Sequence, residues 1–250
     1  MMNRRWVLAI AAGAVAVCGA GPVAASARAV RVDGAWGKAI EVPGLGALSN
    51  GQAAQVFAVS CPSPGNCAAG GDYLSDGRHH AFVVSERNGA WGTAIEVTGL
   101  GRHGAEILTV SCASTGNCAA GGDYTNTFGH QGFVVSEKNG HWGGAIKVPG
   151  LGALNTGGAA YVFSVSCASA DSCTAGGTYS YNEGSGASLG FVVSERNGRW
   201  GRATKVSGLA ALNSGGDADV ESVSCGSAGS CAVGGDYANK RQGSEGFVAV

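Results

Sequence analysis

The sequence predicts an all-β fold built from four copies of one antiparallel sheet. Three observations support this prediction. Tryptophans recur at spacings of 55, 51 and 58 residues, every copy carries two cysteines separated by five residues, and no segment after the N-terminal stretch has sustained helical periodicity. A period of roughly fifty residues is typical of a fold that stacks one supersecondary unit. The tryptophans are Trp36, Trp91, Trp142 and Trp200.

Each copy contains four candidate strands of the length that a propeller blade requires. The first strand is apolar on both alternating faces, as in a strand buried between neighbours, and the second contains small residues that allow another backbone to approach closely. Asn88-Gly89 predicts a two-residue hairpin between the third and fourth strands, because both positions of such a turn take positive φ. In the first copy the predicted strands are Val56–Cys61, Cys67–Tyr73, Phe82–Glu86 and Trp91–Val97.

The copies cover residues 56–97, 107–148, 162–206 and 220–250, within a single domain of residues 30–250. An additional fourth strand is predicted at Trp36–Val42, whereas the last copy contains only three strands. Pairing of Trp36–Val42 with the last copy would complete a fourth blade and remove open sheet edges. We therefore predict a four-bladed β-propeller of four-stranded antiparallel blades, closed by the N-terminal strand. A larger array is expected if the chain is part of a longer protein.

Residues 1–29 have the pattern of a secretory signal peptide. Arg4 and Arg5 precede an apolar stretch too short to span a bilayer, and small residues suitable for cleavage follow. The paired arginines also fit a twin-arginine signal, and Val17 is a poor neighbour for lipid attachment at Cys18. We expect a secreted protein in which no later segment crosses a membrane.

The eight remaining cysteines form four pairs, an even count that indicates disulfides in an exported chain. Zinc is disfavoured, since the sequence lacks the shorter cysteine gaps and the matching histidines of zinc sites. Without Arg4 and Arg5 the chain has 14 basic and 17 acidic residues, a balance that predicts no nucleic-acid partner. The predicted pairs are Cys61–Cys67, Cys112–Cys118, Cys167–Cys173 and Cys225–Cys231.

The connections between strands separate into two classes. The gap between paired cysteines is always five residues, and the connection from the third to the fourth strand also keeps one length. By contrast, the loops between the second and third strands hold 8, 8, 11 and 9 residues, and the linkers between copies hold 13, 9, 13 and 13. Alternate connections of a meander lie at opposite ends of the sheet. The variable loops are therefore predicted to share one face, which repeat proteins often use for binding.

The pattern VSCASTGNCAAGGDY followed by GFVVSEKNGHWG resembles the glycine-rich Ser-Cys repeats of secreted actinobacterial proteins. The layout is also similar to that of Asp-box (sialidase-type) and kelch propellers. It departs from an Asp-box because the segment from Ser85 to Trp91 has no aspartate and is one residue shorter. The resemblance implies an exported β-propeller and no settled activity, since propellers host many unrelated functions.

Side chains in the variable loops are the candidates for a binding site. Neighbouring histidines would suit an imidazole metal site, the arginines resemble the cluster with which sialidase-type propellers grip a carboxylate, and exposed aromatic rings would suit a sugar. The alternative for each is a solvated loop side chain. The candidates are Arg78, His79, His80, Arg102, His103, Phe128, His130, Tyr181 and Arg241.

Asp72, Asp123 and Asp236 end the second predicted strand in three copies, and Thr178 replaces them in the third. A ring of carboxylates would suit Ca²⁺, which takes six to eight oxygen ligands. The favoured interpretation is that each aspartate accepts hydrogen bonds from the backbone of its own turn. Apart from this calcium hypothesis we expect no cofactor, and no residue is identified as catalytic.

We expect a monomeric, non-enzymatic binding or surface-interaction module that contacts a glycan, a cell-wall component or a protein through its variable loops. One alternative is a glycan-acting hydrolase of the sialidase or glycosidase type on the same face. A second is a structural exported protein without a specific ligand. The hydrolase is disfavoured because the sequence does not identify two carboxyl groups on opposite sides of a cleft.

Overall fold

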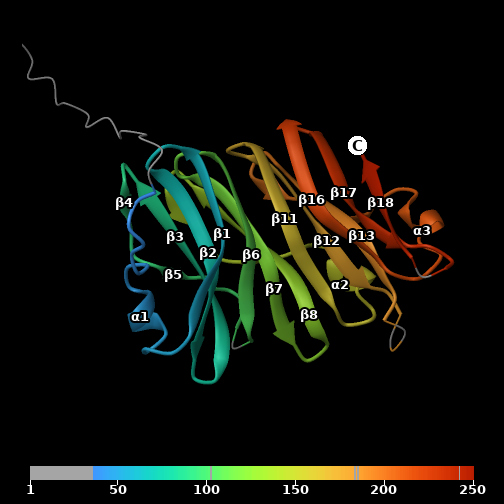
Figure 1. The fold of residues 1–250 in the computed structure, drawn as a ribbon, viewed down its shortest axis with the longest axis horizontal. Coiled ribbons are helices and arrows are strands. Elements are labelled where there is room, and N and C mark those ends of the chain that lie inside the picture. Colours follow the sequence, from blue (N-terminus) through green and yellow to red (C-terminus); the bar gives the residue numbers. More distant parts are fainter. Residues whose placement is uncertain (1–35, 102, 183, 185, 242) are drawn as a thin grey trace, which may run out of the picture. The chain divides into compact units, whose positions relative to one another are not determined.

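Four antiparallel sheets follow one another in chain order, which confirms the predicted all-β repeat (Figure 1). The computed structural model describes residues 36–101, 103–182, 184, 186–241 and 243–250. The first sheet contains β1 (Ala54–Ser63), β2 (Asn66–Ser75), β3 (Arg78–Arg87), β4 (Ala90–Trp91) and β5 (Ile95–Glu96). The second contains β6 (Ala105–Ser114), β7 (Asn117–Asn126), β8 (Gly129–Lys138), β9 (His141–Trp142) and β10 (Ile146–Lys147). The third contains β11 (Ala160–Ser169), β12 (Ser172–Ser180), β13 (Ser188–Arg196), β14 (Arg199–Trp200) and β15 (Thr204–Lys205). The fourth contains β16 (Ala218–Ser227), β17 (Ser230–Ala238) and β18 (Ser244–Ala249).

The fourth strand of each complete sheet is interrupted, whereas the sequence predicted one continuous strand. In the first sheet the predicted strand Trp91–Val97 contains β5 and the end of β4, with a break between them. The backbone N–H of Ala94 lies in this break and donates to the carbonyl of Pro43 at 2.8 Å, outside its own sheet. Equivalent bonds tie the second and third sheets to the linker that precedes them, from Ala145 to Thr98 and from Ala203 to Pro149.

Three one-turn helices occupy the linkers, which the sequence analysis had treated as irregular loops. Each follows a glycine with positive φ and buries its first leucine. The second helix contacts β8 and β12, and the third contacts β13 and β17, so each of these two covers the junction between consecutive sheets. The helices are α1 (Leu45–Leu48), α2 (Leu151–Leu154) and α3 (Leu209–Leu212).

Where two consecutive sheets meet, an apolar side chain from the first strand of the later sheet lies over a glycine in the second strand of the earlier sheet. Ile107 of β6 is fully buried over Gly70 of β2, where an added Cβ would lie 2.7 Å from an Ile107 methyl carbon. A glycine is required here because a side chain would occupy the space of the isoleucine. The same contact recurs at the next two junctions, between Val162 and Gly121 and between Val220 and Gly176.

The second glycine of each Gly-Gly pair allows close approach of two backbones within its own sheet. A Cβ added to Gly122 would lie 1.9 Å from the carbonyl oxygen of Glu106, beside a β-bulge at which the register of β6 shifts between Ile107 and Thr109. The bulge brings the two backbones too close for any side chain. The same 1.9 Å approach occurs at Gly71, Gly177 and Gly235.

The predicted closure by the N-terminal strand is absent from the described residues. Residues 36–42 form no strand, β18 pairs only with β17, and Trp36 is fully exposed instead of lying in a core between blades. Val42 and Leu48 pack against the first sheet. In Figure 1, the first and fourth sheets lie at opposite ends of the row. The bond that Ala94 makes to Pro43 holds this segment at the first sheet instead of the fourth.

The four predicted disulfides are confirmed. Each joins cysteines six positions apart across the turn between the first two strands of a sheet, as predicted for a hairpin staple. The disulfides fit an extracellular protein, because such bonds persist in oxidising compartments. None of the helices in the described part of the chain is long and apolar enough to cross a membrane. The predicted signal peptide and Cys18 lie outside the described residues.

The two classes of connection lie at opposite ends of the sheets. The Asn-Gly turns bond to the disulfide turns, with the N–H groups of Gly89 and Gly140 donating to the carbonyls of Gly65 and Gly116 at 2.8 Å. At the other end the variable hairpins bond to the linkers, as when the N–H of His130 donates to the carbonyl of Gly158 at 2.8 Å. We call this second end the variable-loop face.

Candidate functional site

A pocket of about 780 Å³ opens on the variable-loop face between the second and third sheets. One wall is the hairpin between β7 and β8, and the other is the linker that contains α2. The phenyl ring of Phe128 is 80% exposed at the hairpin tip, where the backbone N–H of Phe128 donates to Asn126 Oδ1 at 2.7 Å. This hydrogen bond closes the turn that presents the ring, so the exposed aromatic predicted from the sequence belongs to a defined pocket.

The polar lining of this pocket consists of neutral amides, hydroxyls and one ammonium group. Lys147 Nζ lies 5.1 Å from the centre of the Tyr124 ring, a cation–π distance that places the charge beside the pocket. No carboxylate is among the lining side chains. The polar residues that line the pocket are Tyr124, Asn126, Thr127, Gln131, Lys147, Asn155 and Thr156.

Asn155 lines this pocket and carries a buried acceptor. Its side-chain nitrogen donates to the carbonyl of His130 at 2.9 Å, while its Oδ1 makes no hydrogen bond within the described chain. At the equivalent position in the linker before the fourth sheet, Asn213 Oδ1 accepts the N–H of Gly216 at 3.1 Å. A buried carbonyl oxygen without a donor costs roughly 1–3 kcal/mol, so Asn155 is held in the pocket wall at a cost in stability that Asn213 does not carry.

Two aspartate–histidine pairs stand beside the variable-loop face. Asp72 and Asp123 are buried, and their Oδ2 atoms contact Nδ1 of His79 and His130, at 2.5 Å in the second pair. The partners are therefore histidines across the hairpin, seven positions later. The described contacts do not support the predicted bonds to the backbone of each aspartate's own turn. The equal Asp-to-His spacing in copies one and two is the signal in the sequence from which these pairs were predictable.

A third carboxylate lies close to these pairs. Glu106 is directly opposite Asp123 in the β6–β7 ladder. Burial and the charge of Asp123 raise the pKa of Glu106, and burial also raises the pKa of Asp123, against the opposing effect of its bond to His130. The site can therefore hold a shared proton between two carboxyl groups. Neither group lines the 780 Å³ pocket, so this acid pair is not placed where the pocket would receive a sugar.

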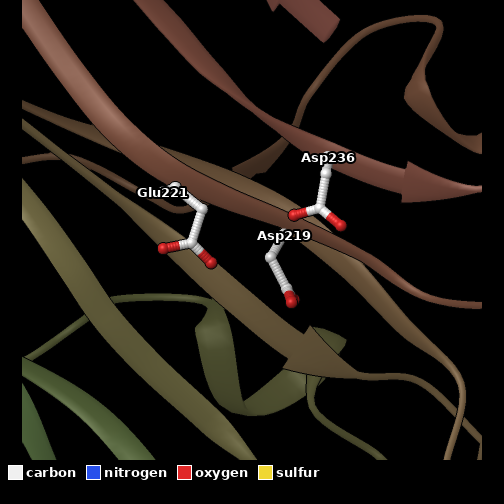
Figure 2. A group of neighbouring side chains, drawn as sticks. All are labelled: Asp219, Glu221 and Asp236. Carbon is white, nitrogen blue, oxygen red and sulfur yellow. The ribbon is translucent and has the colours of Figure 1, made fainter. Parts of the chain in front are cut away.

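Asp236, the third predicted calcium ligand, belongs to a separate group at the fourth sheet (Figure 2). Asp219 and Glu221 of β16 and Asp236 of β17 each offer an oxygen within 4.8 Å of the other two. With one oxygen from each, the three carboxylates supply half or fewer of the six to eight oxygens that Ca²⁺ prefers. Asp236 also accepts a hydrogen bond from Ser244 Oγ at 2.8 Å. Because Asp72 and Asp123 lie in other sheets, the structure does not bring the three predicted aspartates into one cation site.

We expect Asp219→Asn to stabilise the protein at pH 7 by about 0.2–1 kcal/mol, because Asp219 and Asp236 are directly opposite and like charges in that position repel. Burial raises the pKa of Asp219, with the charges of Asp217 and Asp236 adding to the effect. A carboxyl group whose pKa is higher in the folded than in the unfolded protein stabilises the fold while it is protonated. This stabilisation is complete below the unfolded pKa of about 3.9 and is lost as the pH rises through the folded pKa. The gain from Asp219→Asn should therefore vanish in acid.

Urea unfolding at pH 7 and at acidic pH measures this effect. The matched variant is Gln55→Glu, which places a second carboxylate opposite Asp72 in the first sheet and should lower stability at pH 7. A loss of stability in Asp219→Asn at pH 7 would show that the hydrogen bonds of this carboxylate to Thr178 and Ser188 outweigh the repulsion.

The other predicted binding residues are dispersed along the variable-loop face. The ring of His80 stacks on Tyr73 with centroids 5.1 Å apart, and His103 lies 6.4 Å from Tyr124. Tyr181 packs edge-on against Tyr179. The remaining predicted residues with described positions are exposed and none of them lines the pocket; these are Arg78 and Arg241. Arg102 lies outside the described residues.

Sequence reasoning also missed a polar contact that joins the sheets near their disulfide turns. Glu137 is buried and accepts hydrogen bonds from Ser85 Oγ at 2.8 Å and from Arg87 at 2.9 Å, both in the preceding sheet. The indole of Trp142 donates to the same serine oxygen at 2.9 Å. Ser136, Lys138, Glu195 and Trp200 repeat the arrangement one sheet later. The recurrent Ser-Glu-basic triplet was the available signal, and its role is structural.

No known protein-family model matches the chain, and no curated protein matches its sequence. The repeated antiparallel sheets and their four disulfides agree with a repeat protein of the kind predicted from the sequence. The finer resemblance to secreted Ser-Cys repeat proteins remains a prediction.

Proposed function

We propose that this chain is a secreted, non-enzymatic binding module whose ligand is a neutral glycan or cell-wall saccharide, held in the pocket on the variable-loop face. The single observation that supports this proposal is the composition of the pocket: one exposed aromatic ring surrounded by amides and hydroxyls. Apolar pockets with a few convergent polar groups are typical ligand sites.

The chemistry of a sugar matches these groups. The carbon-bound hydrogens on one face of a pyranose can pack on the Phe128 ring, while its hydroxyls exchange hydrogen bonds with the side chains of Gln131 and Thr156. Amides both donate and accept, so they suit hydroxyls better than a purely anionic or cationic lining would. The Lys147 ammonium lies over the Tyr124 ring and can donate to a sugar oxygen.

Binding is favoured over hydrolysis because the pocket has no carboxylate in its lining. A glycosidase needs an acid and a second carboxylate on either side of the scissile bond. The Glu106–Asp123 pair stands outside the pocket, and the acidic group of the fourth sheet lies on other strands. Calcium, if it binds at that acidic group, would be a separate ion and not part of the saccharide site.

We expect Phe128→Ala to weaken saccharide binding about tenfold to a hundredfold, because truncating a central aromatic contact commonly costs roughly 1.4–2.8 kcal/mol. A glycan array with the oxidised protein identifies a ligand, and calorimetry with that glycan measures the affinity of each variant. Asn155→Ala should weaken binding as well. The matched control is Trp36→Ala, since Trp36 is fully exposed and outside the pocket.

The outcome separates the three candidate functions. Release of reducing sugar by the wild-type protein, lost in Glu106→Gln, would favour the hydrolase. A structural role would be favoured if the array gave no glycan signal and if Phe128→Ala and the wild type bound cell-wall preparations equally. Unchanged melting temperature in Phe128→Ala is expected in either case, because the ring is 80% exposed.

A further inference from the structure

Each internal junction joins an inserting surface of one sheet to a receiving surface of the preceding sheet. The first sheet leaves its inserting surface exposed, and the fourth sheet leaves its receiving surface exposed. Ile107 and Val110 of β6 are buried against the first sheet. Their equivalents in β1, Val56 and Val59, are 46% and 62% exposed. This leading face therefore presents the apolar side chains that elsewhere insert into a preceding sheet.

The trailing face presents the matching depression. Gly234 of β17 is equivalent to Gly70, and an added Cβ would meet only atoms of its own sheet, at 3.5 and 3.8 Å. At Gly70 the same Cβ would collide with Ile107 of the next sheet. Beside Gly234, Val248 of β18 is 86% exposed, whereas the equivalent Val83 is buried. Such an apolar face is unusual for a surface that meets only solvent.

Hydrogen bonds show the same complementarity. At each of the three internal junctions, a cysteine in the first strand of one sheet donates its backbone N–H to a serine hydroxyl in the first strand of the preceding sheet, at 3.0 Å. One half of this pair remains at each end: the N–H of Cys61 on the leading face and the hydroxyl of Ser224 on the trailing face. The donors and acceptors of the three existing bonds are Cys112 and Ser60, Cys167 and Ser111, and Cys225 and Ser166.

The N-terminal segment continues the pattern. Each of Thr98 and Pro149 follows the fourth strand of one sheet and accepts a hydrogen bond from the next sheet. Pro43 accepts the equivalent bond from the first sheet, so residues 36–42 occupy the position of a fourth strand belonging to a preceding sheet. Among the described residues the fourth sheet contains β16, β17 and β18, and no strand pairs with the outer edge of β18.

We propose that a second copy of this chain docks its leading face on the trailing face of the first, and that residues 36–42 of the second copy pair with β18 of the first. The contact is heterologous, so it closes into a ring if the rotation between copies permits, or continues as a filament. A ring of two chains would hold eight sheets, within the usual range for propellers. This association departs from the monomer expected from the sequence.

The arrangement of the sheets favours another copy over closure of one chain on itself. In Figure 1, the first and fourth sheets lie at opposite ends of the row, so self-closure would require the internal junctions to change their geometry. These junctions are closely packed around buried side chains and resist such a change. The polar groups also match, since the Gln55 amide would approach Asp236 as Glu106 now approaches Asp72, bringing a donor to the acidic group of the fourth sheet.

A cysteine pair at Ile40 and Val248 tests the proposal. Their equivalents Ile95 and Val83 are directly opposite in the β5–β3 ladder, so Ile40→Cys with Val248→Cys should form a disulfide across the contact. Both side chains are largely exposed, so folding should tolerate the change. We expect a band of twice the monomer mass, or larger, on non-reducing gels, and none from Ile40→Cys or Val248→Cys alone at the same concentration. A cross-link confined within one chain would overturn the proposal.

Light scattering with two face variants gives an independent test. Val59→Lys disrupts the leading face and Gly234→Val fills the trailing face, so each variant alone should be monomeric while the wild type associates as concentration rises. An equimolar mixture should form one heterodimer, because each partner retains the face that the other lacks. The matched control, Ile146→Lys, removes an exposed isoleucine from the second sheet and should associate like the wild type. A wild type that stays monomeric at its highest soluble concentration, or a Gly234→Val protein that still dimerises, would contradict this contact.

Discussion

Reduction of the four disulfides is expected to lower the free energy of unfolding by on the order of 8 kcal/mol, because closing each seven-residue ring contributes about 2 kcal/mol through the entropy of the unfolded chain. Folded domains are stable by only about 5–15 kcal/mol. Most of the margin should therefore be lost, and the reduced protein should unfold near room temperature. Circular dichroism during a urea titration, with and without reductant, measures the difference.

A single-staple variant provides the control for this experiment. Cys225→Ala with Cys231→Ala removes the disulfide of the fourth sheet alone and should cost about 2 kcal/mol. Thiol titration of the native protein should detect none of these eight cysteines. Eight reactive thiols in a protein that keeps its full stability would show that the disulfides contribute nothing to the free energy of unfolding.

Gly122→Ala is expected to destabilise the protein by roughly 1–3 kcal/mol or more, which is the usual range for overpacking a closely packed interior. The added Cβ would lie 1.9 Å from the carbonyl oxygen of Glu106. This oxygen belongs to the backbone of β6, which cannot retreat without breaking the β6–β7 ladder. The effect should appear as a lower midpoint of thermal unfolding.

Gly226→Ala is the matched glycine variant. A Cβ at Gly226 meets nothing within 4 Å, and its φ is not positive, so this change should be neutral or should stabilise by about 0.4–1 kcal/mol. Equal behaviour of the two variants would mean that the bulge of β6 relaxes more readily than its packing suggests.

The variable hairpins illustrate what local sequence could and could not predict about the candidate site. Phe128 was identified because it stands outside the repeated aromatic positions, and it does line the pocket. Asn155 and Lys147 were missed, since one belongs to a linker and the other to a fourth strand, and only the folding of that linker against the second sheet brings them to the same opening. The Asp123–His130 contact was missed for a similar reason: it crosses a hairpin whose register had not been worked out.

By itself, the sequence determined the repeat, the disulfide pairs and the assignment of constant and variable turns to opposite ends of each sheet. These features follow from local chemistry: period-two alternation, the short reach of a disulfide, and turn residues that favour positive φ. The position of residues 36–42 was decided only by tertiary structure. Strand propensity is equally satisfied by pairing with β18 of the same chain, pairing with another copy, or lying beside the first sheet. In the described structure the segment lies beside the first sheet, because the Pro43 carbonyl accepts the N–H of Ala94 while Val42 and Leu48 pack on that sheet, and this position leaves residues 36–42 available to pair with β18 of another copy.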